Sequence, residues 1–491
     1  MTPRALALLV TVAVLGGCSG GSVRAGDEPG DVVTGPPSAD SGFPASWSPE
    51  PLDWTDCPSG GSDSQCATLE VPLDWSEPEG ATIELALARV PSEGEPIGSL
   101  LVNPGGPGAS GIDYLGAFAP TSDLGVNFDL VSWDPRGVGS STALDCDEHV
   151  AALYAADPSP DDADEAAELE DAAGTVARDC SGEPPELLEN LYTEQVARDL
   201  EAIRMALGDD KLNYLGFSYG THIGQTYAEL FGDRIRAMTL DGVVDPSQGF
   251  EEFLIAQAEA FEASFTAQAD ACAAAGTRRC GVADLQAALD EVLAAAEQDP
   301  IPAGSGGMVG PSEVLLAALY VGYVSDGWSI LGPALDEADR GDGEALAELA
   351  AGYTDLSPYG PYAAVVCTDS PHPRGGAEYR AFTERAMEAA PRFGATIASE
   401  MLPCATWPVP PQGEPSAATA QDAPPILVVG NTGDPATPLA NAEAVAESLR
   451  SAVLVVVRSD GHTAYGTNSC ATELIDAYFE RLDVPAEGTR C

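Results

Sequence analysis

The sequence predicts an α/β fold in which a mainly parallel sheet carries an inserted, mainly helical cap. Short, almost continuously apolar runs end in Gly- or Asp-rich turns, which is typical of buried strands in a parallel sheet. Helical patterns lie between several of these runs, and such alternation favours an α/β sheet. From about residue 251 to 400 the chain becomes rich in Ala, Glu and Leu without a strand-like run, which predicts the cap.

The predicted sheet begins at residues 82–90, where apolar and polar residues alternate as in a half-buried strand. The buried strands that we expect after it are 99–102, 128–133, 212–217, 237–240, 426–429 and 453–457. The clearest helix is 193–207, because its apolar residues fall on one face. These elements predict a core formed by residues 49–250 and 401–491, with the cap over 251–400 between its two parts.

The N-terminus predicts export. Arg4 precedes the apolar run 5–15, which is too short to span a bilayer. Small residues then precede Cys18, which resembles the lipobox at which bacterial lipoproteins are cleaved and lipidated. We expect a lipoprotein signal peptide over 1–18 and a flexible, Gly-, Pro- and Ser-rich tether over 19–48. The protein would lie on the outer face of the cytoplasmic membrane, held only by lipid on Cys18, or be released; the alternative is secretion without lipid.

The charge excludes one class of partner. With 21 basic and 78 acidic residues, the formal net charge is −57. Such a surface repels phosphate backbones and anionic membranes, so we expect no nucleic-acid partner. The hydrophobic share of 44% is that of a folded protein.

The cysteines predict disulfides. Eleven cysteines less Cys18 leave ten, an even number in an exported chain, which suggests five bonds. The pairs that we expect are Cys57–Cys66, Cys146–Cys180, Cys272–Cys280, Cys367–Cys404 and Cys470–Cys491. The alternative is that some cysteines are free and buried. No metal site is expected, because no CxxC motif occurs and the four histidines lack ligand spacing.

The strongest chemical signal is Gly216-Phe217-Ser218-Tyr219-Gly220, which follows an apolar strand and precedes a helix-like segment. In this context the glycines permit a strained turn that exposes the hydroxyl of Ser218 as a nucleophile. The alternative is a serine that only caps the helix.

A general base and its partner follow two later strands. We expect His462 to be the base, because strand-end loops carry the reactive groups of such sheets, whereas His149, His222 and His372 have no such position. Asp434, after strand 426–429, would orient the base, with Asp460 as the weaker rival. The order Ser, Asp, His is that of α/β-hydrolases. Together with the helical segment 251–400, it predicts an α/β-hydrolase sheet with an inserted, mainly helical cap.

The loop after strand 99–102 predicts an oxyanion hole. Its sequence is Asn103-Pro104-Gly105-Gly106-Pro107-Gly108, and glycine amides can approach a substrate oxygen closely. We expect donors at Gly105, Gly106 and Tyr219, the residue after the nucleophile. The alternative is an ordinary Gly/Pro turn.

Several motifs together resemble a known family. NPGGPGASG at 103–111, DPRGVGSS at 134–141, GFSYGT at 216–221, GDPATP at 433–438 and DGHT at 460–463 look like those of the secreted actinobacterial tripeptidyl aminopeptidases, which are related to proline iminopeptidases. The resemblance spans roughly residues 50 to 491. It implies a serine exopeptidase that removes short peptides, tripeptides in particular, from free N-termini without a cofactor.

An aminopeptidase needs a group that binds the substrate's ammonium. Acidic residues after a strand or in the cap are suitable, and the candidates are Asp241, Asp245 and Asp369. A carboxylesterase or lipase with the same triad is the alternative function. A binding lipoprotein without catalysis is a third reading, which an intact triad disfavours.

Overall fold

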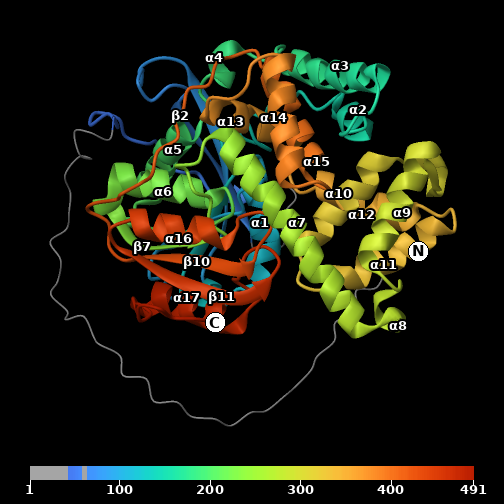
Figure 1. Cartoon of the computed structure of the whole chain (residues 1–491). Coiled ribbons are helices and arrows are strands. Elements are labelled where there is room, and N and C mark those ends of the chain that lie inside the picture. Colours follow the sequence, from blue (N-terminus) through green and yellow to red (C-terminus); the bar gives the residue numbers. More distant parts are fainter. Residues whose placement is uncertain (1–41, 58–63) are drawn as a thin grey trace, which may run out of the picture. The chain divides into compact units, whose positions relative to one another are not determined.

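A nine-stranded sheet forms the centre of this computed structural model, which describes residues 42–57 and 64–491 (Figure 1). The strand order is β1-β2-β3-β5-β4-β6-β7-β10-β11. The strands are β1 (Thr55–Asp56), β2 (Gln65–Pro72), β3 (Thr82–Val90), β4 (Ser99–Asn103), β5 (Asp129–Trp133), β6 (Leu212–Phe217), β7 (Ile235–Asp241), β10 (Ile426–Gly433) and β11 (Ala452–Asp460).

The parallel part of the sheet positions the site. Strands β1, β2, β3 and β5 pair antiparallel, whereas every pairing from β5 through β4, β6, β7 and β10 to β11 is parallel. Parallel pairing brings the carboxyl ends of these strands to one edge, where ligands bind in sheets of this kind.

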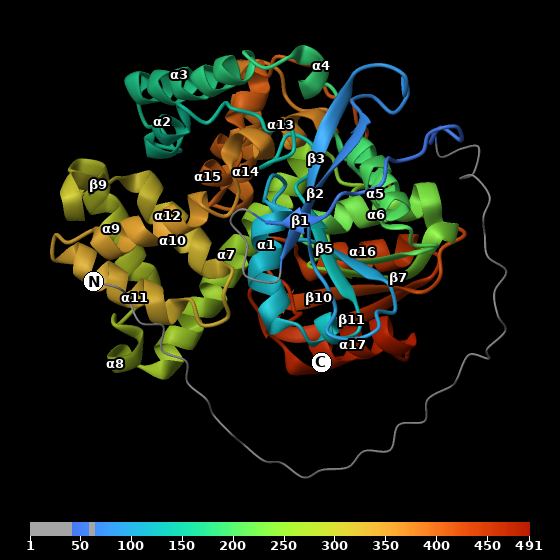
Figure 2. The ribbon, with the colours of Figure 1, turned by 180° about the vertical axis from the view of Figure 1, so that it is seen from behind.

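Helices cover both faces of the sheet. Figure 1 shows the side covered by α5, α6 and α16, and Figure 2 shows α1 and α17 on the other side. Alternate strand residues pack into two separate buried clusters; Leu101 and Met238, for example, belong to the first and Leu100 and Ala237 to the second. This alternation follows from the two-residue period of a strand. The helices are α1 (Gly111–Phe118), α5 (Thr193–Leu207), α6 (Gly220–Phe231), α16 (Leu439–Ser448) and α17 (Ser469–Arg481).

The chain between β7 and β10 is mainly helical. Its helices are α7 (Phe250–Ala275), α8 (Thr277–Cys280), α9 (Leu285–Gln298), α10 (Pro311–Gly322), α11 (Trp328–Asp339), α12 (Glu344–Thr354), α13 (Tyr359–Asp369), α14 (Gly376–Ala389) and α15 (Gly394–Glu400). We refer to α7–α15 as the cap. The cap also contains a small hairpin of β8 (Ile301–Ala303) and β9 (Gly307–Val309), which no strand-like run in the sequence had indicated. Three-residue strands are too short to show alternation in a sequence.

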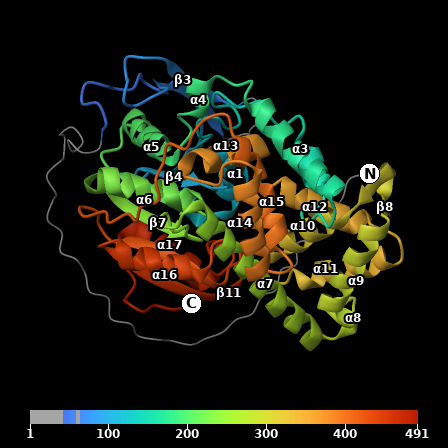
Figure 3. The same cartoon turned by 45° about the horizontal axis from the view of Figure 1, so that its top comes forward.

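A second helical segment packs against the cap, although it lies within residues 49–250, which were predicted to belong to the core. Helices α2 (Val150–Ala155), α3 (Ala163–Cys180) and α4 (Pro185–Leu188) lie between β5 and β6 in the chain. Figures 1 and 3 show α3 beside the cap helices α14 and α15. Arg380 of α14 pairs with Glu170 of α3, and Ser399 donates to the carbonyl of Pro158. The apolar stripe of a helix indicates that the helix packs against another element, but it does not identify that element.

The structure describes only the last part of the predicted N-terminal segments. The signal peptide, Cys18 and the tether up to residue 41 lie outside them. The tether was expected to extend to residue 48, but Phe43 is buried and stacks on Trp75 with ring centroids 4.8 Å apart. The packed part of the chain therefore begins earlier than predicted. Across the described residues, none of the helices is long and apolar enough to cross a membrane.

Five disulfides join ten cysteines, in the pairs that were expected: Cys57–Cys66, Cys146–Cys180, Cys272–Cys280, Cys367–Cys404 and Cys470–Cys491. The first closes the β1–β2 edge of the sheet, and the last ties the C-terminus to α17. Such a set is typical of proteins that fold outside the cytoplasm.

Candidate active site

Ser218 lies on the sharp turn between β6 and α6. Its φ of 53° is in the left-handed region, which a residue with a side chain rarely adopts. The flanking glycines are required by close packing: a Cβ on Gly216 would lie 2.5 Å from the carbonyl oxygen of Gly220, and one on Gly220 would lie 2.8 Å from that of Asn103. The turn also binds β7, because the Ser218 amide donates to the Asp241 carbonyl over 3.0 Å. Packing and hydrogen bonds therefore hold the strained serine.

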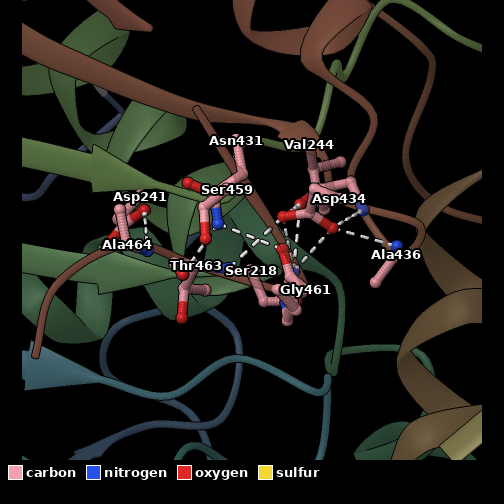
Figure 4. Close-up of polar contacts among 12 residues, drawn as sticks. Ser218, Asp241, Val244, Asn431, Asp434, Ala436, Ser459, Gly461, Thr463 and Ala464 are labelled. Atoms are coloured by element: carbon pink, nitrogen blue, oxygen red, sulfur yellow. Dashed lines mark hydrogen bonds and ion pairs between the residues drawn. The ribbon is translucent and has the colours of Figure 1, made fainter. Parts of the chain in front are cut away.

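His462 and Asp434 form a hydrogen-bonded pair. The Nδ1 of His462 lies 2.9 Å from both carboxylate oxygens of Asp434. Asp434 is buried and also accepts from the amides of Ala436 at 3.0 Å and Thr463 at 3.3 Å (Figure 4). The Thr437 hydroxyl donates to Asp434 at 3.0 Å and lies 3.3 Å from His462 Nδ1. This network fixes the imidazole with its other nitrogen, Nε2, available for a proton.

The environment of His462 changes its basicity. Burial alone lowers the pKa of the imidazole, but the charge of Asp434, its hydrogen bond and the charge of Asp241 outweigh burial and raise it above its ordinary value. The base is therefore a stronger proton acceptor than an isolated histidine.

The other histidines and the rival acid have different surroundings. His149 pairs with Asp179 at 2.5 Å in an exposed position, and the Nδ1 of His372 lies 3.2 Å from the carbonyl of Pro373. His222 faces the same cavity as Ser218, but burial lowers its pKa and its nearest carboxylate, Asp369, is 4.0 Å away. Asp460 is exposed at the end of β11.

Two backbone amides remain available beside the nucleophile. In the described part of the chain, no acceptor is recorded for the amides of Gly106 and Tyr219. The Gly105 amide instead donates to the Asn103 side chain over 3.0 Å. Gly105 was expected to be a donor, and this bond occupies it. Its role is steric, since a Cβ there would lie 2.7 Å from the Tyr219 amide nitrogen.

Ser218 and His462 line one cavity of about 620 Å³. The core contributes the loop from Pro104 and the cap contributes Phe250, Tyr323 and others, so the cap covers the carboxyl edge of the sheet. The carboxyl groups that line the cavity are those of Glu194, Glu229, Asp245, Asp369, Glu400 and Glu414. Among the described residues, no lysine or arginine lines it. The cavity is therefore suited to cationic ligands and unsuited to anionic ones.

The structure places the three acidic candidates differently. Asp241 is fully buried and does not line the cavity; its carboxylate accepts from the amides of Ala464 and Tyr465. Its candidacy as an ammonium ligand was wrong, because the direction of a side chain at a strand end does not follow from the sequence. Asp245 and Asp369 do line the cavity. Asp245 accepts from the amide and hydroxyl of Ser247 at 2.9 and 2.7 Å.

Asp369 also accepts hydrogen bonds from within the protein, one on each oxygen. It accepts from the Thr193 amide at 2.5 Å and the Thr193 hydroxyl at 2.6 Å. The same hydroxyl contacts the Tyr219 hydroxyl, so Asp369 supports the ring of the residue after the nucleophile. Burial raises the pKa of Asp369, while His222 and the Thr193 hydrogen bonds oppose the shift.

Glu400, which was not predicted from the sequence, ends α15 and lines the cavity. Its two carboxylate oxygens accept from the hydroxyls of Tyr154 at 2.9 Å and Tyr353 at 3.1 Å. Burial raises the pKa of Glu400 to about 7, although these hydrogen bonds act against the shift. Tyr323 and Tyr362 line the cavity near it. Nothing in the local sequence distinguishes this glutamate, because its surroundings come from four separate segments.

The strained serine, the His–Asp pair and the free amides around one cavity define a serine hydrolase with an α/β-hydrolase fold. Comparison with known proteins identifies the family. Residues 98–289 match the family model described as alpha/beta hydrolase fold, and residues 390–491 match the model described as TAP-like protein.

The chain is 34% identical over 473 residues to serine protease Hip1 of Mycobacterium tuberculosis, covering 90% of this chain and 91% of that protein. It is 33% identical over 473 residues to the tripeptidyl aminopeptidase of Streptomyces coelicolor, covering 90% and 86%. It is 34% identical over 456 residues to carboxylesterase B of Mycobacterium tuberculosis, covering 87% and 86%. The chain belongs to the tripeptidyl aminopeptidase family of α/β-hydrolases and is a serine hydrolase of the peptidase type.

Proposed function

We propose that this protein is an exported exopeptidase that releases short peptides, tripeptides in particular, from the free N-termini of peptide substrates. The observation that carries the proposal is the cavity at Ser218, which is lined by six carboxyl groups and, in the described part of the chain, by no fixed cation. A free N-terminus supplies the positive charge that such a cavity attracts.

The proposed reaction passes through an acyl-enzyme. The Ser218 hydroxyl attacks the scissile carbonyl while its proton passes to Nε2 of His462, and Asp434 stabilises the imidazolium. The amides of Gly106 and Tyr219 bind the oxyanion of the tetrahedral intermediate. His462 then gives the proton to the leaving amine as the C–N bond breaks. Water hydrolyses the ester in the same way and restores the serine.

Glu400 is the proposed partner of the substrate's ammonium. Each of its carboxylate oxygens has one recorded donor, a tyrosine hydroxyl, so each retains capacity for another. Asp369 accepts from the Thr193 amide on one oxygen and from the Thr193 hydroxyl on the other, and Asp245 accepts both Ser247 donors on a single oxygen. What distinguishes Glu400 is that both of its donors are hydroxyls of tyrosine rings that line the cavity. Aromatic rings beside Glu400 also suit a cation. An ammonium would stabilise the ionised carboxylate, whose pKa burial otherwise raises.

The test compares one tripeptide anilide with a free and an N-acetylated N-terminus. We expect acetylation to lower kcat/KM on the order of a hundredfold, because a partly buried ion pair is lost. Glu400→Gln should remove most of this difference without abolishing hydrolysis of a neutral ester. Asp245→Asn and Asp369→Asn, each with the same two substrates, show whether another acid carries the preference. Equal cleavage of free and acetylated peptides by the wild-type enzyme would refute the proposal.

A carboxylesterase activity is the second candidate function. One relative is named carboxylesterase B, and Phe250, Phe253 and Leu254 give the cavity an apolar wall that fits an acyl chain. The same triad serves both reactions. Short and long acyl esters therefore belong in the same substrate panel, and a kcat/KM for esters far above that for every free peptide would favour this function.

We further propose that the protein is anchored to the membrane by lipid on Cys18. The basis is the sequence Leu15-Gly16-Gly17-Cys18 after an apolar run of signal-peptide length. Cys18→Ser should remove the lipid mass from the mature N-terminal peptide and shift the protein from the membrane fraction to the medium. A wild-type protein without lipid on this peptide would disprove the anchor.

A further inference from the structure

We propose that Asp241 and Asn431 form a clamp that sets the position of His462 relative to Ser218. The inference rests on the proposed catalytic triad but not on the choice between peptide and ester substrates. Both residues are buried at the carboxyl ends of neighbouring parallel strands, Asp241 on β7 and Asn431 on β10. Neither lines the cavity, so both act through other residues.

Asp241 contacts the nucleophile turn and the histidine loop at once. Its backbone carbonyl accepts from the Ser218 amide at 3.0 Å. Its carboxylate accepts from the amide of Ala464 at 3.0 Å (Figure 4) and from that of Tyr465 at 2.8 Å. These amides lie two and three residues after His462. A single buried residue thus fixes the distance between the segments that carry the nucleophile and the base.

Asn431 holds the same loop by donating hydrogen bonds, whereas Asp241 accepts them. Its side-chain amide donates to the carbonyls of Gly461 at 3.0 Å and Thr463 at 2.8 Å, which flank His462 in the chain. Figure 4 shows Asn431 and Asp241 both directed at this loop. The loop needs such support because Thr463 has a φ of 64°, a left-handed conformation that costs free energy for a β-branched residue.

The charge of Asp241 adds an electrostatic effect to the positional one. Three titratable groups surround its carboxylate: His462, Asp434 and Tyr114 of α1. Burial raises the pKa of Asp241 to about 6, although the amides of Tyr465 and Ala464 and the charge of His462 oppose the shift. The ionised carboxylate helps to raise the pKa of His462.

The test measures kcat, KM and the pH profile of full-length variants with a neutral ester, so that the outcome does not depend on the ammonium subsite. Asp241→Asn places a donor against backbone amides that also donate. We expect kcat to fall on the order of a hundredfold with little change in KM, as for a catalytic group displaced by about 1 Å. The acid limb of the profile should move to lower pH, because a negative charge near His462 is lost. Asn431→Ala should lower kcat without moving the limb.

A matched control separates positioning from general stability. Asp209 also accepts from a backbone amide, that of Ser99 at 3.3 Å, and burial raises its pKa, but it lies near the start of β4 and β6, at the opposite edge of the sheet. Asp209→Asn should lower the melting temperature and leave kcat and the pH profile unchanged. If folded Asp241→Asn has wild-type kcat and an unmoved acid limb, the clamp is wrong. Should that variant not fold, a wild-type kcat for Asn431→Ala overturns the proposal equally.

Discussion

His462 is subject to two opposed influences. Burial disfavours its charged form, whereas Asp434 and Asp241 favour it, and the net result is a raised pKa. An imidazole with a raised pKa becomes protonated at higher pH on acidification, and a protonated imidazole cannot accept the proton of Ser218. We therefore predict that the acid limb of kcat/KM lies above the ordinary histidine value of about 6.5.

A variant of Asp434, the partner of His462, tests the cause of the raised pKa. Asp434→Asn removes the main carboxylate, so the limb should move to lower pH and kcat should fall by several orders of magnitude as the imidazole loses its orientation. A pH series of kcat/KM for both proteins checks this. An acid limb at the same pH in the two proteins would mean that Asp434 does not set the basicity of His462.

Gly105 allows a sharp test of the nucleophile's surroundings. Its φ is 92°, and a Cβ would lie 2.5 Å from the Phe217 carbonyl oxygen and 2.7 Å from the Tyr219 nitrogen. Gly105→Ala should therefore displace the loop from the turn at Ser218 and lower kcat by at least tenfold, since an oxyanion donor is worth about 10² to 10³ in rate.

The matched control is Gly116→Ala in α1, where an added Cβ meets no atom within 4 Å. This change should leave activity intact and stabilise the helix by about 0.5–1 kcal/mol. Ester hydrolysis and thermal unfolding of both variants give the comparison. Normal activity of Gly105→Ala would show that the loop does not control the oxyanion amides.

Single residues differ in how far the sequence reveals them. Ser218, Asp434 and His462 were predicted from their positions after buried strands; in the structure Ser218 and His462 line one cavity, and Asp434 is hydrogen-bonded to His462 behind it. Glu400 and Asn431 were not predicted, because a carboxyl or amide acquires its role only from residues distant in the chain. Asp241 shows the converse: its position suggested contact with substrate, but its side chain points into the protein.

The cap contacts the catalytic base directly. The His462 amide donates to the Tyr323 carbonyl at 3.0 Å, just after α10, and the two rings meet edge to face at 5.4 Å. Gln268 of α7 orders this turn: its side chain donates to the Val321 carbonyl at 3.1 Å and accepts from the Trp328 amide at 2.6 Å. The geometry of the cap is thus linked to the position of His462.

Gln268→Ala should therefore affect both stability and activity. Loss of the buried hydrogen bonds should lower the free energy of unfolding by about 1–3 kcal/mol, and a looser turn at Tyr323 should lower kcat. Gln298→Ala, at the exposed end of α9, is the control, and its effect on unfolding should stay within about 0.5 kcal/mol. Denaturant unfolding and ester kinetics give both values. A destabilised Gln268→Ala enzyme with unchanged kcat would show that the cap does not position the base.

The elements themselves could be predicted where they are long and periodic. The parallel strands and α5 follow from apolar runs and a 3.6-residue period. The β8–β9 hairpin was missed because it is short, and the attachment of α2 and α3 to the cap was missed because tertiary neighbours leave no periodic signal.

The net charge of the whole molecule favours cationic substrates. The chain has a formal charge of −57, and carboxyl groups line the cavity at Ser218. Such a field attracts cations over about a Debye length, which is about 10 Å at 0.1 M salt. We predict that kcat/KM for a free peptide falls as salt rises from about 0.01 to 0.5 M, while kcat/KM for a neutral ester changes little. Equal salt dependence for the two substrates would contradict electrostatic steering.

We propose that the enzyme removes short peptides, one unit at a time, from a free N-terminus. Mass spectrometry of the products from a nonapeptide, with the N-terminus free or acetylated, tests it most directly, with Ser218→Ala as the inactive control. We expect the first products to be the N-terminal tripeptide and the remaining hexapeptide, and the acetylated peptide to be cleaved on the order of a hundredfold more slowly. Internal cleavage of both peptides at similar rates, or no cleavage of either by an enzyme that hydrolyses esters, would contradict it.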